Sequence, residues 1–324
     1  MLRVNAERRR VGHQATLPIT HLVEGYLTRD QIIALLREDP VRGPLGGEVI
    51  AEGDSGIRIG DQSMEVVRVP AHEMVDWEKM GVWGVLEASG ARVQERLAEE
   101  HRTQGKARKV VVTAPTKGGD GIAHTLIVGY NEHAYDPGKH HVLTNESCTT
   151  KSALHVAEAL RKKFGLSAIS LTTVHAETGP EKRDLIARSG RVEDLALLGF
   201  QPQSTGSQGA LTKLFPNVDV SAEAYRVPVT DGSVSDITFK VERRASLSRA
   251  WEVLVTSVQP DIWQVVQTIR SSVDLIGNPH DAVVARDTLT VIGRNLVRVR
   301  AGYDNAYAPA RAALDAMAYV RAHS

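Results

Sequence analysis

The residue most able to do covalent chemistry is the single cysteine, Cys148, which stands in residues 145–150 (NESCTT). A strand-like segment precedes it and a helical pattern follows, so the sulfur is expected at a helix N-terminus, where the helix dipole favours a thiolate. Lys151 adds a positive charge in the first turn. A lone cysteine is more often an inert buried hydrophobe. The flanking Ser and Thr residues argue against an apolar site here.

A histidine ends the strand-like run 171–175 (LTTVH). A single histidine at a strand end is usually structural or merely exposed. If His175 meets the Cys148 thiol, the pair has the composition of a nucleophile and its general base. Neither signal is specific without the other.

The elements that must position these residues change character along the chain. Short β-rich runs at 109–113 and 125–129 alternate with helical patterns at 29–37 and 94–101, which is typical of buried strands in an α/β domain. A helix is predicted from Thr149 to Phe164, with Gly165 as its C-terminal stop. Longer alternating strands at 168–174, 222–229 and 233–241 then predict a mixed or antiparallel sheet. The last helix, at 310–321, is expected to return to the first domain.

Composition excludes several classes of protein. The chain has 324 residues, with 39 basic side chains balanced by 39 acidic ones, so it lacks the charge of a nucleic-acid or membrane-surface binder. No apolar run reaches the roughly 18 residues that span a bilayer, and the N-terminal residues lack the core of a secretory signal. One cysteine rules out an internal disulfide and a multi-cysteine metal site, and we expect no metal. We therefore expect a cytoplasmic protein.

An ordered series of short motifs resembles the phosphorylating glyceraldehyde-3-phosphate dehydrogenases. The matching segments are 128–132 (VGYNE), 135–137 (YDP), 145–150 (NESCTT), 172–175 (TTVH), 204–206 (STG), 226–228 (RVP) and 303–305 (YDN). Each motif alone is weak. Their order and spacing agree from about residue 27 to the C-terminus, which makes the resemblance specific.

The resemblance implies an α/β fold with two domains. A truncated, Rossmann-like N-terminal domain would span residues 1–147 and be completed by the C-terminal helix at 306–324. An α+β catalytic domain with a mixed or antiparallel sheet would span residues 148–305. The resemblance also implies that Cys148 attacks the substrate and His175 acts as base, giving a thioester that phosphate cleaves.

The resemblance further implies two anion sites for a phosphorylated small-molecule substrate. The inorganic-phosphate site would be formed by Ser147, Thr149, Thr205 and Gly206. Thr178 and Arg226 would hold the substrate phosphate, for which arginine offers a permanently charged, bidentate clamp.

The cofactor region departs from the family. The family opens with a strand and a glycine-rich turn that approaches the dinucleotide pyrophosphate. Aligned with that turn, Gly12 is the third glycine, but Glu7 and Arg9 occupy the first two glycine positions. We therefore expect no NAD binding through the family's usual contacts. Asn305, which matches the residue that holds the nicotinamide amide, leaves NAD(P) binding in an altered mode open.

Three functions remain. The first, which we favour, is a cysteine enzyme that takes an acyl phosphate and passes the acyl group from Cys148 to an acceptor that the sequence does not identify. The second is an NAD(P)-dependent phosphorylating aldehyde dehydrogenase. The third is a catalytically silent paralogue, against which the retained catalytic residues argue. The resemblance also implies a homo-oligomer, either a dimer or a tetramer.

Overall fold

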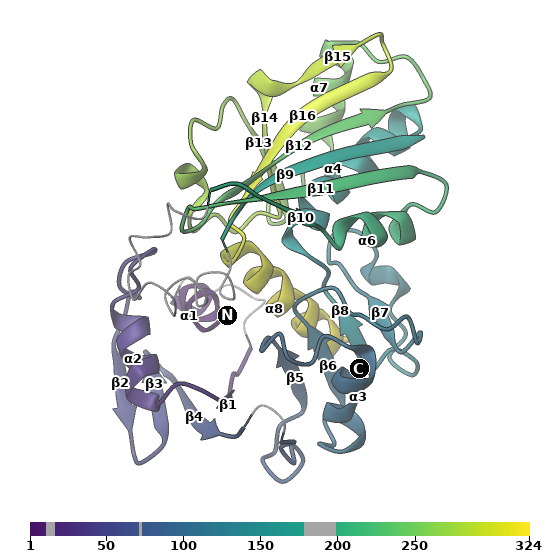
Figure 1. Ribbon diagram of the computed structural model, residues 1–324. Coiled ribbons are helices and arrows are strands. Elements are labelled where there is room, and N and C mark those ends of the chain that lie inside the picture. The colour runs from purple at the N-terminus through teal and green to yellow at the C-terminus, as the bar shows by residue number, and fades with distance from the viewer. Residues whose placement is uncertain (11–16, 71–72, 178–198) are drawn as a thin grey trace. The chain divides into compact units, whose positions relative to one another are not determined.

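The computed structural model describes residues 1–10, 17–70, 73–177 and 199–324. These residues divide into two compact units. The first unit consists of Met1–Glu146 and Ala310–Ser324, and the second consists of Ser147–Pro309. Figure 1 labels the elements of both units along the chain.

The first unit is built on parallel and mixed sheets. Its elements are α1 (Leu2–Arg10), β1 (His21–Glu24), α2 (Arg29–Arg37), β2 (Val49–Glu52), β3 (Gly56–Ile59), β4 (Gln62–Arg68), β5 (Gly84–Glu87), α3 (Glu95–Thr103), β6 (Lys109–Val112), β7 (Ala123–Thr125), η1 (Glu132–Ala134), β8 (Val142–Thr144) and most of α8 (Tyr307–Ala322). Over the described residues, β1, β4, β3 and β2 form one sheet in that order, in which only β1 and β4 are parallel. The strands β5, β6, β8 and β7 form a second, wholly parallel sheet.

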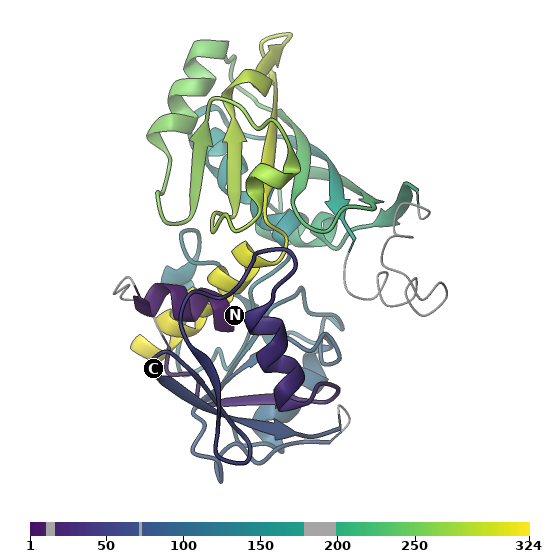
Figure 2. The same cartoon turned by 90° about the vertical axis from the view of Figure 1, so that its left-hand side faces the viewer.

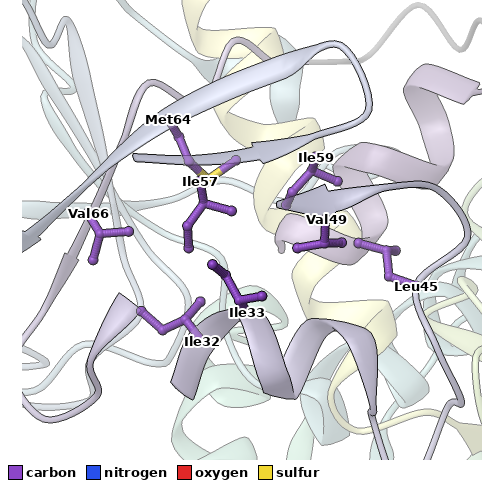
Figure 3. Packing of buried hydrophobic residues seen from close by; sticks show 8 residues of the cluster. All are labelled: Ile32, Ile33, Leu45, Val49, Ile57, Ile59, Met64 and Val66. Atoms are coloured by element: carbon purple, nitrogen blue, oxygen red, sulfur yellow. The ribbon is translucent and has the colours of Figure 1, made fainter. Parts of the chain in front are cut away.

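The helix α2 shows how local sequence sets these elements. Thr28 caps it by accepting from the backbone N–H of Gln31, whose side chain accepts in turn from the Thr28 backbone N–H. Its apolar face presents Ile32 and Ile33 to the β2–β4 region of the sheet (Figure 3). The rest of this buried cluster consists of Leu45, Val49, Ile57, Ile59, Met64 and Val66.

The N-terminal segment is a helix, α1, where the resembled family opens with a strand. The Asn5 side chain anchors α1 by bonding both the backbone N–H and the carbonyl of Leu17. Arg8 pairs with Asp315 of α8 at 2.7 Å, so the two helices are in contact within this unit (Figures 1 and 2). Gly12 lies outside the described residues.

The second unit places helices on a long mixed sheet (Figure 2). Its elements are α4 (Cys148–Phe164), β9 (Ala168–Ala176), β10 (Gln201–Ser204), α6 (Ser207–Leu214), β11 (Asp219–Val227), β12 (Ser233–Lys240), α7 (Leu247–Thr256), β13 (Trp263–Val266), η3 (Ser272–Leu275), β14 (Ala282–Ala285), η4 (Arg286–Thr288), β15 (Thr290–Ile292) and β16 (Leu296–Tyr303). The strand order is β10-β11-β9-β12-β16-β14-β13, with β15 paired to β16. α4 packs against β9, β12, β14 and β16 and also contacts α6 and α7.

The α/β fold with a truncated Rossmann-like unit and a mixed-sheet unit is therefore confirmed. The strand predicted at 125–129 is wrong beyond Thr125, where β7 ends. The Asn131 side chain bonds the Thr125 carbonyl and the Ile127 N–H, both at 2.8 Å, and this folds the apolar run into a turn. Gly129 has a φ of +86°, which such a turn requires and a strand does not allow.

Candidate active site

Cys148 is the first residue of α4, which begins one residue before the predicted start at Thr149, so the sulfur lies at a helix N-terminus as expected. Ser147 is the N-cap, and its hydroxyl accepts from the Thr150 backbone N–H at 3.0 Å. Gly165 ends the helix with a φ of +72°. The two helix ends therefore place the Cys148 thiol at the N-terminal end of α4, which packs against the sheet.

The structure brings Cys148 and His175 together. The distance between Cys148 Sγ and His175 Nε2 is 3.4 Å. His175 lies near the end of β9, and its Nδ1 is 2.7 Å from the carbonyl oxygen of Ala176. Nε2 faces the thiol and, in the tautomer that carries its proton on Nδ1, can accept the thiol proton. The pair has the geometry of a nucleophile and its general base.

Arg226 joins this pair through strand register. β11 runs parallel to β9, with Arg226 directly opposite His175. The guanidinium donates to the Ala176 carbonyl at 3.2 Å, and its Nη1 contacts His175 Nδ1. Nε of Arg226 also donates to the Gln203 side chain at 3.4 Å. A permanently charged group therefore lies beside the thiol and imidazole.

The expectation of a thiolate favoured in the resting site is wrong in direction. Burial raises the pKa of the Cys148 thiol above its ordinary value, although Cys148 as a whole residue is only partly buried. The charge of Lys151, hydrogen bonds from Thr149 and the charge of Arg226 lower that pKa but do not outweigh burial. Helix position alone could not show this, because desolvation of the sulfur depends on packing from distant segments. A neutral thiol that gives its proton to His175 fits the site better.

A group of hydroxyls lies where the α4 and α6 helices begin. Ser207 Oγ lies 3.1 Å from Ser147 Oγ and 3.0 Å from Thr205 Oγ1, and Ser147 Oγ lies 2.7 Å from Thr150 Oγ1. Gly206 is the N-cap of α6. Hydroxyl groups that lie together with two helix N-termini provide hydrogen-bond donors and positive dipole ends, which favour the binding of an anion. The sequence analysis missed Ser207, whose place directly after the Ser-Thr-Gly motif was the available signal.

Tyr303 is a second residue that the sequence analysis gave no role of its own. It is fully buried, and its hydroxyl lies 3.0 Å from Thr149 Oγ1 and 2.7 Å from Thr173 Oγ1. Its ring meets the His175 ring edge-on, with 6.0 Å between centroids. Burial raises the pKa of Tyr303, so it stays a neutral hydroxyl. The contact with the Tyr303 hydroxyl therefore fixes the position of the Thr149 side chain.

The remaining predicted site residues are less informative. The Asn305 side-chain oxygen accepts from the Gly232 N–H at 3.1 Å and from the Ser233 hydroxyl at 3.0 Å. Thr178 and Gly12 lie outside the described residues. Within the part of the chain that the structure describes, no group of three His, Cys, Asp or Glu side chains could hold a metal, and no helix is long and apolar enough to cross a membrane.

The chain is an α/β protein with a Rossmann-like unit and a mixed-sheet unit. The mixed-sheet unit carries a cysteine–histidine pair with an arginine beside it, which is a candidate site for covalent catalysis. Residues 147–305 match the family model described as glyceraldehyde 3-phosphate dehydrogenase, C-terminal domain. With the relatives of 30% and 31% identity described next, this match shows that the chain belongs to the glyceraldehyde-3-phosphate dehydrogenase family.

Curated relatives extend the match over most of the chain. Glyceraldehyde-3-phosphate dehydrogenase 2 of Nostoc sp. is 30% identical over 289 residues, covering 87% of this chain and 84% of the relative. The enzyme of Kitasatospora aureofaciens is 31% identical over 290 residues, covering 87% and 85%. Glyceraldehyde-3-phosphate dehydrogenase 4 of Caenorhabditis elegans is 26% identical over 319 residues, covering 94% and 91%.

Proposed function

We propose that this chain is a cysteine enzyme that forms an acyl thioester on Cys148 from a phosphorylated three-carbon acyl phosphate, or from the corresponding aldehyde where NAD(P) accepts the hydride. The observation that carries the proposal is the 3.4 Å contact between Cys148 Sγ and His175 Nε2, with the Arg226 guanidinium beside it. Family membership supports the substrate class, because the relatives are named for glyceraldehyde 3-phosphate, a three-carbon aldehyde with a phosphate.

With an acyl phosphate, the reaction needs no oxidant. The Cys148 thiol gives its proton to Nε2 of His175, and the sulfur attacks the acyl carbon. The bond from that carbon to the phosphate oxygen then breaks, and the departing phosphate takes the proton back from Nε2. The products are a thioester on Cys148 and inorganic phosphate. A second nucleophile of unknown identity then accepts the acyl group.

The anion sites receive the two phosphates. Arg226, together with Thr178, would hold the phosphate that stays on the substrate, and the guanidinium fork suits such a group. The transferred phosphate would lie at the start of α4 and α6, where the hydroxyl contacts of Ser147 support its binding. The other residues proposed for that site are Thr149, Thr205 and Gly206.

The N-terminal segment does not fit the family's usual contacts with a dinucleotide. Glu7 and Arg9, at the two glycine positions, lie on α1, and Arg9 pairs with Asp61 at 2.8 Å. A carboxylate and a long side chain there oppose the close backbone approach of a pyrophosphate. We therefore propose that NAD(P) is not bound in that mode, and the acyl-phosphate route above has no step through it.

A second candidate function follows from the family itself, whose members use NAD(P). The chain would then be an NAD(P)-dependent phosphorylating aldehyde dehydrogenase that binds the dinucleotide through altered contacts, with Asn305 near the nicotinamide. The third candidate is a silent paralogue.

One experiment separates the three functions. The purified chain, freed of nucleotide, is incubated with 1,3-bisphosphoglycerate and its intact mass is measured, with Cys148→Ser as the control. NAD and NADP are titrated by calorimetry in parallel. A Cys148-dependent acyl adduct without dinucleotide binding is the expected result. Tight dinucleotide binding would favour the dehydrogenase, and the absence of both would leave the silent paralogue.

We also propose that the two units are the functional domains, that the protein is cytoplasmic, and that it forms a homodimer or homotetramer. Support for assembly comes from Val174 and Tyr225, which are opposite each other on β9 and β11 and stay 45% and 37% exposed. An exposed apolar pair on a sheet face suits burial against a second copy. Light scattering that finds only monomer at micromolar concentration would refute this proposal.

A further inference from the structure

The backbone amide that follows His175 is held by a side chain. The register between β9 and β12 ends at Val174 and Val234. Beyond this pair, the Ala176 backbone N–H donates to the Ser233 hydroxyl oxygen at 3.1 Å, and Ser233 is fully buried. Because a buried amide needs an acceptor, this hydroxyl replaces the carbonyl that a longer strand pair would supply.

The direction of the Ser233 hydroxyl follows from its second partner. The Asn305 side-chain oxygen accepts from the Gly232 backbone N–H at 3.1 Å, and a backbone N–H can only donate. The Ser233 hydroxyl lies 3.0 Å from the same oxygen and therefore donates to it. Its oxygen accepts from the Ala176 amide, so one chain of hydrogen bonds runs from Ala176 through Ser233 to Asn305.

Ala176 also supplies the carbonyl that faces the imidazole. Its oxygen lies 2.7 Å from His175 Nδ1. The next amide, that of Glu177, donates to the Val227 carbonyl at 3.2 Å. The backbone of Ala176 is therefore held from both sides, by Ser233 of β12 and by Val227 of β11, and its carbonyl sets the direction of the imidazole ring.

The other groups that face His175 come from three further elements. Cys148 Sγ of α4 lies 3.4 Å from Nε2, and Arg226 of β11 contacts Nδ1. The Tyr303 ring of β16 meets the imidazole edge-on. Each of these contacts depends on where the ring lies, and a displacement of about 1 Å in a reacting group can slow a reaction about a hundredfold.

We propose that Ser233 is a positioning residue for the general base. Its hydroxyl, oriented by Asn305, holds the Ala176 backbone, and this keeps Nε2 of the imidazole directed at the thiol. The inference rests on the proposed function, in which His175 takes the proton of Cys148. It also gives Asn305 a role in the site that does not require a dinucleotide.

Removing the Ser233 hydroxyl in Ser233→Ala tests this role. The matched control is Thr288→Val at η4, because the Thr288 hydroxyl makes the same two kinds of bond. It accepts from the Arg300 backbone N–H at 2.9 Å and donates to the Ala285 carbonyl at 2.8 Å. The readout is the rate of iodoacetamide labelling, followed by intact mass at neutral pH and above the pKa of the thiol. Because the chain has one cysteine, the mass reports Cys148 alone.

We expect Ser233→Ala to slow labelling at neutral pH about tenfold, which is part of the factor of about a hundred that loss of the base would cost. Above the pKa of the thiol its rate should converge with that of the wild type, since a thiolate needs no base. Thr288→Val should label like the wild type at both pH values.

A double variant separates positioning from a purely structural effect. Added to His175→Asn, Ser233→Ala should cause no further loss, because no base remains to be positioned. Thermal melting confirms that each variant is folded. If Ser233→Ala does not fold, Asn305→Ala releases the Ser233 hydroxyl instead and should slow labelling several-fold at neutral pH.

Three results would overturn the inference. The folded Ser233 variant, or Asn305→Ala in its place, could label like the wild type at neutral pH. The loss could persist above the pKa of the thiol, which would assign it to altered access. The loss could also add in full to that of His175→Asn. The proposed function fails separately, if His175→Asn labels as fast as the wild type or if wild-type Cys148 forms no acyl adduct.

Discussion

Replacing His175 by asparagine isolates the general base from the rest of the site. The imidazole Nε2 lies 3.4 Å from Cys148 Sγ, and asparagine offers no group there that can take a proton. The asparagine amide can still donate to the Ala176 carbonyl, the bond that Nδ1 makes at 2.7 Å. The end of β9 should therefore keep its backbone arrangement while the base is lost.

The expected loss follows from the thiol's own ionisation. Burial raises the pKa of Cys148 above its ordinary value. Even at an ordinary pKa of about 8.5, a thiol is only about 3% thiolate at neutral pH. Both proteins therefore present mostly the neutral thiol, and the labelling rate depends on the group that takes the thiol proton as the sulfur attacks. General-base catalysis typically contributes about a hundredfold or more, so we expect His175→Asn to slow iodoacetamide labelling at neutral pH by about that factor relative to the wild type.

The assay uses the single cysteine, so that intact mass follows one site. Above the pKa of the thiol both proteins carry the thiolate, and their labelling rates should converge. This convergence shows that access to the sulfur is unchanged. An exposed histidine in the first unit, changed in His133→Asn, is the control and should label like the wild type. Equal rates for His175→Asn and wild type at neutral pH would refute the general-base role.

Three further substitutions have outcomes set by the structure. Burial raises the pKa of Glu87, but hydrogen bonds from His101 and Ser89 outweigh it and hold the pKa below its ordinary value. The resulting stabilisation is present above the unfolded pKa of about 4.3 and is lost as the pH falls through the folded pKa. Glu87→Gln should therefore lower the free energy of unfolding by about 1–3 kcal/mol at neutral pH, as measured by urea denaturation, because the new amide faces the His101 donor. This loss of stability should become smaller in acid. Arg226→Lys keeps the charge but loses the fork, so calorimetric affinity for a phosphorylated substrate should fall more than tenfold, or at least ~1.4 kcal/mol. Ser207→Ala removes a hydroxyl that lies within hydrogen-bond distance of the Ser147 and Thr205 hydroxyls. Inorganic phosphate should then protect Cys148 from iodoacetamide less well, with its affinity reduced several-fold, or by about 1 kcal/mol.

Each of these substitutions can fail in a definite way. A Glu87→Gln protein as stable as the wild type at neutral pH would mean that the buried network adjusts around the amide. Unchanged substrate affinity in Arg226→Lys would show that the arginine does not touch the ligand. If phosphate protects Ser207→Ala as well as the wild type, the hydroxyls at the start of α6 do not bind the anion.

Local signals in the sequence were enough for much of the framework. The helical pattern at 29–37 predicted α2, and Gly165 was predicted as the end of α4, because each signal depends on residues a few positions apart. The pairing of Cys148 with His175 was predicted from the family resemblance. Register between β9 and β11, which puts Arg226 opposite His175, comes from sheet pairing that no single strand encodes.

The failures have a common physical cause. The direction of the Cys148 pKa shift and the burial of Lys151 depend on desolvation by segments far away in the sequence. Ser207 carries little signal on its own, since a serine at the start of a helix is common. Its importance comes from its 3.1 Å contact with Ser147, sixty residues earlier. Long-range packing therefore decided the electrostatics and the hydroxyl cluster.

The structure of the first unit affects which reaction the site in the second unit can catalyse. In a Rossmann fold the dinucleotide lies at the carboxyl ends of the strands, and its pyrophosphate meets the glycine turn after the first strand. Here the segment that would supply this strand is α1, whose Arg8 bonds Asp315 on α8. Over the described residues the unit holds two separate sheets, β1-β4-β3-β2 and β5-β6-β8-β7, in place of the single sheet that the first strand would join. Since Cys148, His175 and Arg226 all belong to the second unit, the proposed nucleophile, base and phosphate-binding cation do not depend on that strand. Acyl transfer from a phosphorylated substrate uses only these groups, whereas hydride transfer also needs the dinucleotide, and this difference is why we favour the acyl-phosphate route.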